Sequence, residues 1–168
     1  LYMEECKKMK IKVLCPDVNE SFYKFAVNKK SEIRFGLGAI KGVGESAVNS
    51  IVEERKQNGI YKSFSDFVKR VDLRSCNKRT IESLVLSGGF DSFEIDRARY
   101  FHVEDEQSYI EKMIKFGNKI QQDKSSTQID IFGGAQEIEL ESPKAPICEK
   151  WKTMEFLSKE KEVVGIYL

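Results

Sequence analysis

A two-glycine turn that leads directly into an amphipathic segment is the feature that most limits how this chain can fold. The turn is Lys41-Gly42-Val43-Gly44. Glycine tolerates positive φ and carries no Cβ to hold another molecule away from the backbone. After the turn, apolar residues recur at one-turn spacing, which predicts a helix from about Glu45 to Asn58, ended by Gly59. Those apolar residues are Ala47, Val48, Ile51 and Val52.

This turn and helix start have two interpretations. The turn is either a tight connection between two packed helices or an anion site, formed by amide groups at the start of the helix with the charge of Lys41 beside them. Spacing alone does not separate the two.

A second helix-turn-helix follows the first. Ser63 is placed to cap a helix with apolar residues at 64, 67, 68 and 71, and Asn77 to cap another that ends at Gly88-Gly89. The connecting turn has no glycine, and its polar residues are Arg74, Ser75, Asn77, Lys78 and Arg79. Two such units can share a core that one unit cannot form. A pseudo-twofold pairing would put both turns on one surface, where they suit the two phosphate backbones of a duplex.

Charge is distributed unevenly along the chain. Residues 1–93 contain 17 lysines and arginines against 12 acidic residues, about +5, whereas residues 94–168 contain 11 against 15, about −4. Polyanion binding is therefore plausible only for the first half. Overall, 40% apolar and 33% charged residues are typical of soluble proteins, and we expect a cytoplasmic chain with no membrane partner.

The residues that bind metals in proteins are poorly placed here. Four cysteines without CxxC spacing and a single histidine predict free thiols in a reducing compartment and argue against zinc. The acidic clusters at 104–106 and at 137, 139 and 141 are interpreted as solvated faces, because no second carboxylate motif completes a two-metal site. We interpret His102 as structural.

The predicted fold class is mainly α with a small β element. Residues 1–32 are expected to hold the end of a helix and a small β element. The inward residues expected for the β element are Ile11, Val13, Phe25 and Val27, and Ile33 and Phe35 continue the pattern just after residue 32. The paired helix-turn-helix occupies 33–93 and a helical extension 94–122. A linker at 123–150 begins with the polar stretch 123–127. In 151–168 we expect a Thr153-capped helix with Met154, Leu157 and either Lys161 or Val164 inward, and then a strand from Val163.

A short peptide within the predicted linker is unusual. Gln128-Ile129-Asp130-Ile131-Phe132 places two large apolar residues three and four positions after a glutamine, in polar surroundings. Extended peptides of this kind dock by inserting apolar anchors into a partner's pocket. The alternative is an edge strand that folds back on its own domain.

Several segments together resemble the α subunit of bacterial replicative DNA polymerase III. Their order and spacing make the resemblance specific across most of the chain. The segments are KVLCPDVNES at 12–21, IRFGLGAIKGVGESAV at 33–48, FSDFVKRVDLRSCNKRTIESLVLSGGFDSF at 64–93, QIDIF at 128–132 and EKEVVGIYL at 160–168.

The resemblance implies a piece of that polymerase: the C-terminal fingers region, a tandem helix-hairpin-helix module, and a C-terminal helix leading toward an OB-type domain. It implies duplex DNA and the sliding clamp as partners, with other holoenzyme subunits reached through the parent protein. The implied DNA-binding residues are Lys41, Gly42, Val43, Gly44 and Ser46 in the first hairpin, and Arg74, Ser75, Asn77, Lys78 and Arg79 in the second. The implied clamp-binding residues are Gln128, Asp130, Ile131 and Phe132.

The resemblance also limits what this chain does by itself. In that family the aspartates that hold magnesium for nucleotidyl transfer belong to the palm, and no segment of this sequence matches them. We therefore expect an enzyme as the parent but no polymerase activity, and no cofactor, in this chain. The alternatives are a stand-alone helix-hairpin-helix protein of repair or recombination, and a helical scaffold without a ligand.

Overall fold

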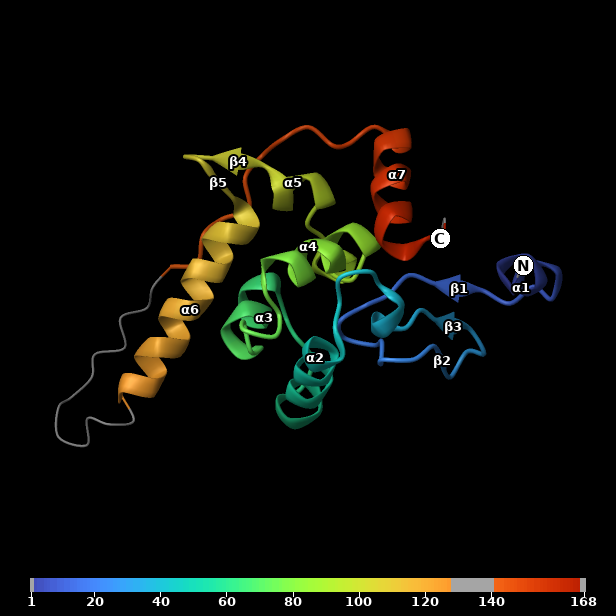
Figure 1. Cartoon of the computed structure of the whole chain (residues 1–168), viewed down its shortest axis with the longest axis horizontal. Coiled ribbons are helices and arrows are strands. Elements are labelled where there is room, and N and C mark those ends of the chain that lie inside the picture. The colour runs from blue at the N-terminus through green and yellow to red at the C-terminus, as the bar shows by residue number, and fades with distance from the viewer. Residues whose placement is uncertain (1, 128–140, 167–168) are drawn as a thin grey trace.

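The computed structural model describes residues 2–127 and 141–166, which form mainly helices with two small sheets (Figure 1). The elements before the second turn are α1 (Tyr2–Lys8), β1 (Val13–Leu14), β2 (Ala26–Val27), β3 (Ile33–Arg34), the 3-10 turn η1 (Leu37–Ala39), α2 (Glu45–Asn58) and α3 (Phe64–Arg70). Those after it are α4 (Lys78–Ser87), the 3-10 turn η2 (Asp91–Phe93), α5 (Arg97–Phe101), β4 (Val103–Glu104), β5 (Gln107–Ser108), α6 (Tyr109–Thr127) and α7 (Thr153–Val164). The predicted fold class is confirmed.

The first sheet has the strand order β1-β3-β2, with β1 parallel and β2 antiparallel to β3. It confirms the predicted β element, but two of the expected inward residues are exposed: Phe25 by 51% and Val27 by 70%. The reason is that β2 is an edge strand of only two residues and Phe25 lies just before it, so neither side chain is held over the core. Phe25 instead meets the buried Phe35 edge-on, with 4.5 Å between ring centroids.

An aromatic cluster forms the centre of the core and joins the helical units. Phe64 lies 5.0 Å from Tyr100 and 5.2 Å from Phe90, and Phe67 lies 4.8 Å from Phe90, all as ring-centroid distances. The inward residues predicted for α2 and α3 are buried in the same core as these rings, and so are Ile81, Leu84 and Val85 of α4. The four cysteines are free thiols, as predicted.

Helix α6 packs along α3 and extends further than predicted. Gly117 permits the close approach, because a Cβ at this position would lie 2.5 Å from the carbonyl oxygen of Val68. The Gln121 side chain donates hydrogen bonds to the carbonyls of Val68 and Val71 at 3.0 and 2.9 Å, which satisfies acceptors at the end of α3. Residues 123–127, expected to start a linker, are helical because they continue this anchored helix.

The segment 141–150 is irregular, as predicted, and α5 holds it in place. Arg99 donates hydrogen bonds to the carbonyls of Pro146 and Ala145 at 2.6 and 2.8 Å. The Phe101 and Trp151 rings lie 5.5 Å apart just before α7 begins.

Helix α7 differs from the prediction at both ends. Its N-cap is Lys152 rather than Thr153, without a side-chain cap, and Met154 is 79% exposed. Val164, the alternative to Lys161 for the inward face, is buried, whereas Lys161 is exposed. Val163, expected in a strand, lies beside it in the buried face of α7 against α4, and Gly165 ends the helix at φ 81°. Among the described residues, no helix is long and apolar enough to span a membrane.

Candidate nucleic-acid interface

The start of α2 has backbone donors without internal partners. Its N-cap is Gly44, at φ −80° and ψ 163°, so no side chain caps the helix. Within the described part of the chain, no acceptor reaches the amide groups of Glu45, Ser46 or Ala47. Since the first amides of a helix also carry the positive end of its dipole, this end can bind an anion.

The two glycines of the first turn serve different purposes. Gly42 has φ +89°, its carbonyl accepts a hydrogen bond from Thr80 Oγ1 at 3.2 Å, and a Cβ on it would lie 2.8 Å from Ser83 Oγ. Gly42 is therefore required by its backbone angle and by packing on α4. Gly44 has an ordinary φ, and a Cβ on it would meet no atom within 4 Å. Of these two glycines, only Gly42 adopts the positive φ that glycine tolerates.

Three cations lie in the two turns and at the start of α4. Lys41, Arg74 and Arg79 are exposed, and no carboxylate of the described residues lies within ion-pair distance of them. Arg79 Nε would lie 3.8 Å from a Cβ on Gly42, so α4 brings this guanidinium to the first turn. The two helix starts thus share one positively charged surface.

The other two predicted residues of the first hairpin, Val43 and Ser46, differ in the exposure of their side chains. The Val43 side chain is buried, at 7% exposure, so only its backbone faces outward. Its amide donates to the Ile40 carbonyl at 3.1 Å. Ser46 is exposed on the first turn of α2, next to the free amides.

The second turn packs against the start of α2 but uses its polar residues internally. Cys76 Sγ lies 3.7 Å from the Ala47 carbonyl oxygen, and the Asn77 side chain caps α4 by accepting from the Thr80 amide at 3.1 Å. Lys78 Nζ is 2.9 Å from Glu111 Oε1 on α6, and this hydrogen bond with those from Ser108 lowers the pKa of Glu111 to about 2. Asn77 and Lys78 are therefore less available to a ligand than predicted.

Asp72 was not among the residues predicted for the interface, but its carboxylate binds the backbone amides of the second turn. Its carboxylate accepts hydrogen bonds from the Arg74 amide at 3.1 Å, the Ser75 amide at 3.3 Å and the Ser75 hydroxyl at 2.6 Å. The Ser75 hydroxyl and the two amides hold the pKa of Asp72 below its ordinary value. An aspartate two residues before exposed amides is an Asx-turn signal that the sequence contains.

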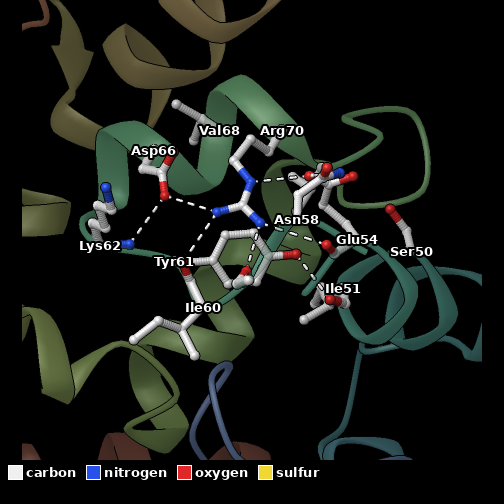
Figure 2. A network of polar contacts seen from close by, with 12 residues as sticks. Ser50, Ile51, Glu54, Asn58, Ile60, Tyr61, Lys62, Asp66, Val68 and Arg70 are labelled. Atoms are coloured by element: carbon white, nitrogen blue, oxygen red, sulfur yellow. Dashed lines mark hydrogen bonds and ion pairs between the residues drawn. The ribbon is translucent and has the colours of Figure 1, made fainter. Parts of the chain in front are cut away.

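A network at the far end of α2 fixes this helix to α3 (Figure 2). Arg70 Nε lies 2.9 Å from Glu54 Oε1, Arg70 Nη1 lies 2.9 Å from Asp66 Oδ2, and Arg70 also donates to the carbonyls of Gly59 and Ile60. Tyr61 lies under this guanidinium and donates its hydroxyl to the Ile51 carbonyl at 2.8 Å. The network closes the loop between the two helices.

Helix α7 also supports the first turn, through a backbone hydrogen bond from Lys41 to Val163. The Lys41 amide donates to the Val163 carbonyl at 2.9 Å. Arg97 and Glu160, 5% and 3% exposed at their side chains, form a buried ion pair at 2.8 Å, and Arg97 also donates to the Leu86 carbonyl at the end of α4. The position of the first turn therefore depends on α7.

The predicted clamp-binding residues Gln128, Asp130, Ile131 and Phe132 lie outside the described residues. Within residues 2–127 and 141–166, no group of three or more histidine, cysteine, aspartate or glutamate side chains is placed to hold a metal ion. Magnesium for the parent protein stays an expectation from the resemblance.

Comparisons with known proteins agree with this geometry. A family model described as a helix-hairpin-helix motif matches residues 10–100. DNA polymerase III subunit alpha of Pasteurella multocida is 37% identical over 166 residues, 98% of this chain, and that of Saccharopolyspora erythraea is 37% identical over 174 residues, 100% of this chain. The Escherichia coli subunit is 34% identical over 167 residues. The chain spans 14% of the length of each of these relatives. It therefore belongs to the helix-hairpin-helix family, and over nearly its whole length it is similar to one segment of the DNA polymerase III α subunit.

Proposed function

We propose that this chain is the part of a replicative DNA polymerase that holds duplex DNA by its phosphate backbone. The observation that carries the proposal is the uncapped start of α2. Within residues 2–127 and 141–166, its first amides have no acceptor and the neighbouring Lys41 and Arg79 have no ion-pair partner. A phosphate oxygen would accept from the amides of Glu45 and Ser46 while the two cations neutralise its charge. Such contacts fix the position of a duplex without reading its sequence.

The proposal extends to the longer protein through the similarity to DNA polymerase III subunit alpha. Nucleotidyl transfer and its magnesium ions would belong to other parts of that protein, and this chain would support replication by binding the duplex. We expect no primer extension by the 168-residue chain with magnesium and nucleotides. Extension above background would contradict this division of roles.

Titration of a labelled duplex with the chain at two salt concentrations tests the DNA interface. We expect a dissociation constant in roughly the micromolar range or weaker near 50 mM salt, rising steeply by 200 mM, because only a few phosphates are neutralised. Lys41→Ala and Arg79→Ala should each weaken binding to every duplex sequence and reduce the slope of log affinity against log salt by about 1.

Lys29→Ala is the matched control, because Lys29 is an exposed lysine in the turn between β2 and β3. It should leave the dissociation constant and the salt slope nearly unchanged. Sequence-selective binding, or binding that is equal at both salt concentrations, would refute the phosphate-backbone account.

We further propose that Gln128, Asp130, Ile131 and Phe132 dock on the sliding clamp. The support is the motif itself, in which Gln128 fixes the register and Ile131 and Phe132 are the apolar anchors. Gln128→Ala combined with Phe132→Ala should abolish pull-down of purified clamp and leave duplex binding unchanged. Undiminished capture would place the clamp contact elsewhere.

A further inference from the structure

The two turns of the module offer their backbone donors to solvent in different ways. At the first turn the amides of Glu45 and Ser46 have no acceptor among the described residues, and Gly44 leaves the space beside them open. At the second turn the amides of Arg74 and Ser75 already donate to Asp72. The Ser75 hydroxyl adds a third, shorter hydrogen bond to the same carboxylate.

We propose that the Asp72 carboxylate closes the second turn to phosphate by occupying the position that a phosphate oxygen would take. This inference rests on the proposed duplex binding and deepens it. A phosphate that approached these amides would have to displace a carboxylate held by three hydrogen bonds, and it would meet a like charge there. The module thus binds a duplex asymmetrically, with backbone amides, Lys41 and Arg79 at the first turn and only the charge of Arg74 at the second.

The backbone of the second turn is also held by contacts that do not use the Asp72 side chain. The Asp72 amide donates to Ser50 Oγ at 3.1 Å, and the Cys76 amide donates to the Asp72 carbonyl at 2.8 Å. The Asn77 cap holds the start of α4 independently. Replacing the Asp72 side chain should therefore open the turn without unfolding it, which thermal unfolding of each variant checks.

The experiment compares Asp72→Ala, Asp72→Asn and the wild-type chain in duplex titrations between 50 and 200 mM salt. Asp72→Ala removes both the charge and the acceptor, so it should bind more tightly at low salt, with a salt slope steeper by about 0.9. Its advantage over wild type should therefore shrink by about 3.5-fold across this range. Asp72→Asn loses the charge but keeps an acceptor oxygen for the amides, and should gain less. Glu53→Ala, which removes an exposed charge from α2, is the control.

Amide NMR shifts provide an independent measurement on the wild-type chain. Addition of duplex should shift Glu45 and Ser46 strongly and Arg74 and Ser75 weakly, and Asp72→Ala should make the second pair respond. Equal gains from Asp72→Asn and Asp72→Ala, or gains no larger than that of Glu53→Ala, would overturn the closure. Strong wild-type shifts at Arg74 and Ser75 would also overturn it. Failure of the wild-type chain to bind any duplex would instead refute the proposed function.

Discussion

Substitution of the two glycines of the first turn separates DNA binding from folding. Gly44 lies at an N-cap with an ordinary φ and open space around it, so Gly44→Val should cost only about 0.5–1 kcal/mol of stability. For a chain of this size that cost corresponds to a fall in melting temperature of roughly 1–4 °C. At Gly42, with φ +89°, a left-handed side-chain residue costs about 1–2 kcal/mol before the contact with Ser83 Oγ is counted.

The effects on DNA binding should run in the opposite order. A valine at position 44 would stand in front of the free amides of Glu45 and Ser46 and hold a phosphate away from them. Loss of one hydrogen bond to a charged group costs about 1.5–3 kcal/mol, so the dissociation constant for a duplex should rise on the order of tenfold or more. Gly42→Ala should lower the melting temperature more than Gly44→Val does. At temperatures where both variants are folded, Gly42→Ala should weaken duplex binding less than Gly44→Val does.

Thermal unfolding and fluorescence anisotropy with a labelled duplex near 50 mM salt measure both quantities on the same preparations. Duplex binding by Gly44→Val as tight as that of wild type would contradict the anion site at the start of α2. Unfolding of Gly44→Val, with Gly42→Ala as stable as wild type, would show that the roles assigned to the two glycines are wrong.

Two further substitutions test the support and the electrostatics of the first turn. Glu160→Gln should lower the free energy of unfolding by up to about 3 kcal/mol in chemical denaturation, because among the described residues it leaves the buried Arg97 with Asp91 as its one carboxylate partner. Glu155→Gln, on the exposed side of α7, is the control and should have almost no effect. An equal loss in both variants would contradict the importance of the buried pair. Glu45→Gln removes a carboxylate from the anion site, so it should tighten duplex binding several-fold at low salt but not at high salt. A gain in affinity that persists at high salt would show that charge is not the cause.

Local signals in the sequence were sufficient for the helices of the paired unit. The side chains of Ser63 and Asn77 cap their helices as expected, and Gly59 and Gly88 follow the ends of α2 and α4. Caps and one-turn periodicity depend only on neighbours in the chain, so they can be identified without tertiary information. The predicted division into domains and the DNA-binding roles of individual residues stay predictions.

What the sequence did not predict depends on contacts between distant segments. Residues 123–127 are polar and suggested a linker, but α6 is fixed to the end of α3 by Gln121, some fifty positions from its acceptors. Val163 and Val164 have high strand propensity, yet burial against α4 keeps them helical. In both places tertiary packing outweighs the local preference of the chain.

The shared surface of the two helix starts follows from reciprocal contacts between the units. The first turn is bonded to the start of α4 through Thr80 and the Gly42 carbonyl, and the second turn is bonded to the start of α2 through Ser50 and the Asp72 amide. Each turn is thus held by the helix of the other unit, which fixes the separation of the two turns before any ligand arrives. A preorganised surface loses little entropy on binding, so even a few phosphate contacts can orient a duplex. Because the contact between Asp72 and Ser50 uses backbone, the side chain at position 72 is free to differ in chemistry without moving the turn. The same scaffold can therefore carry one open turn and one closed turn.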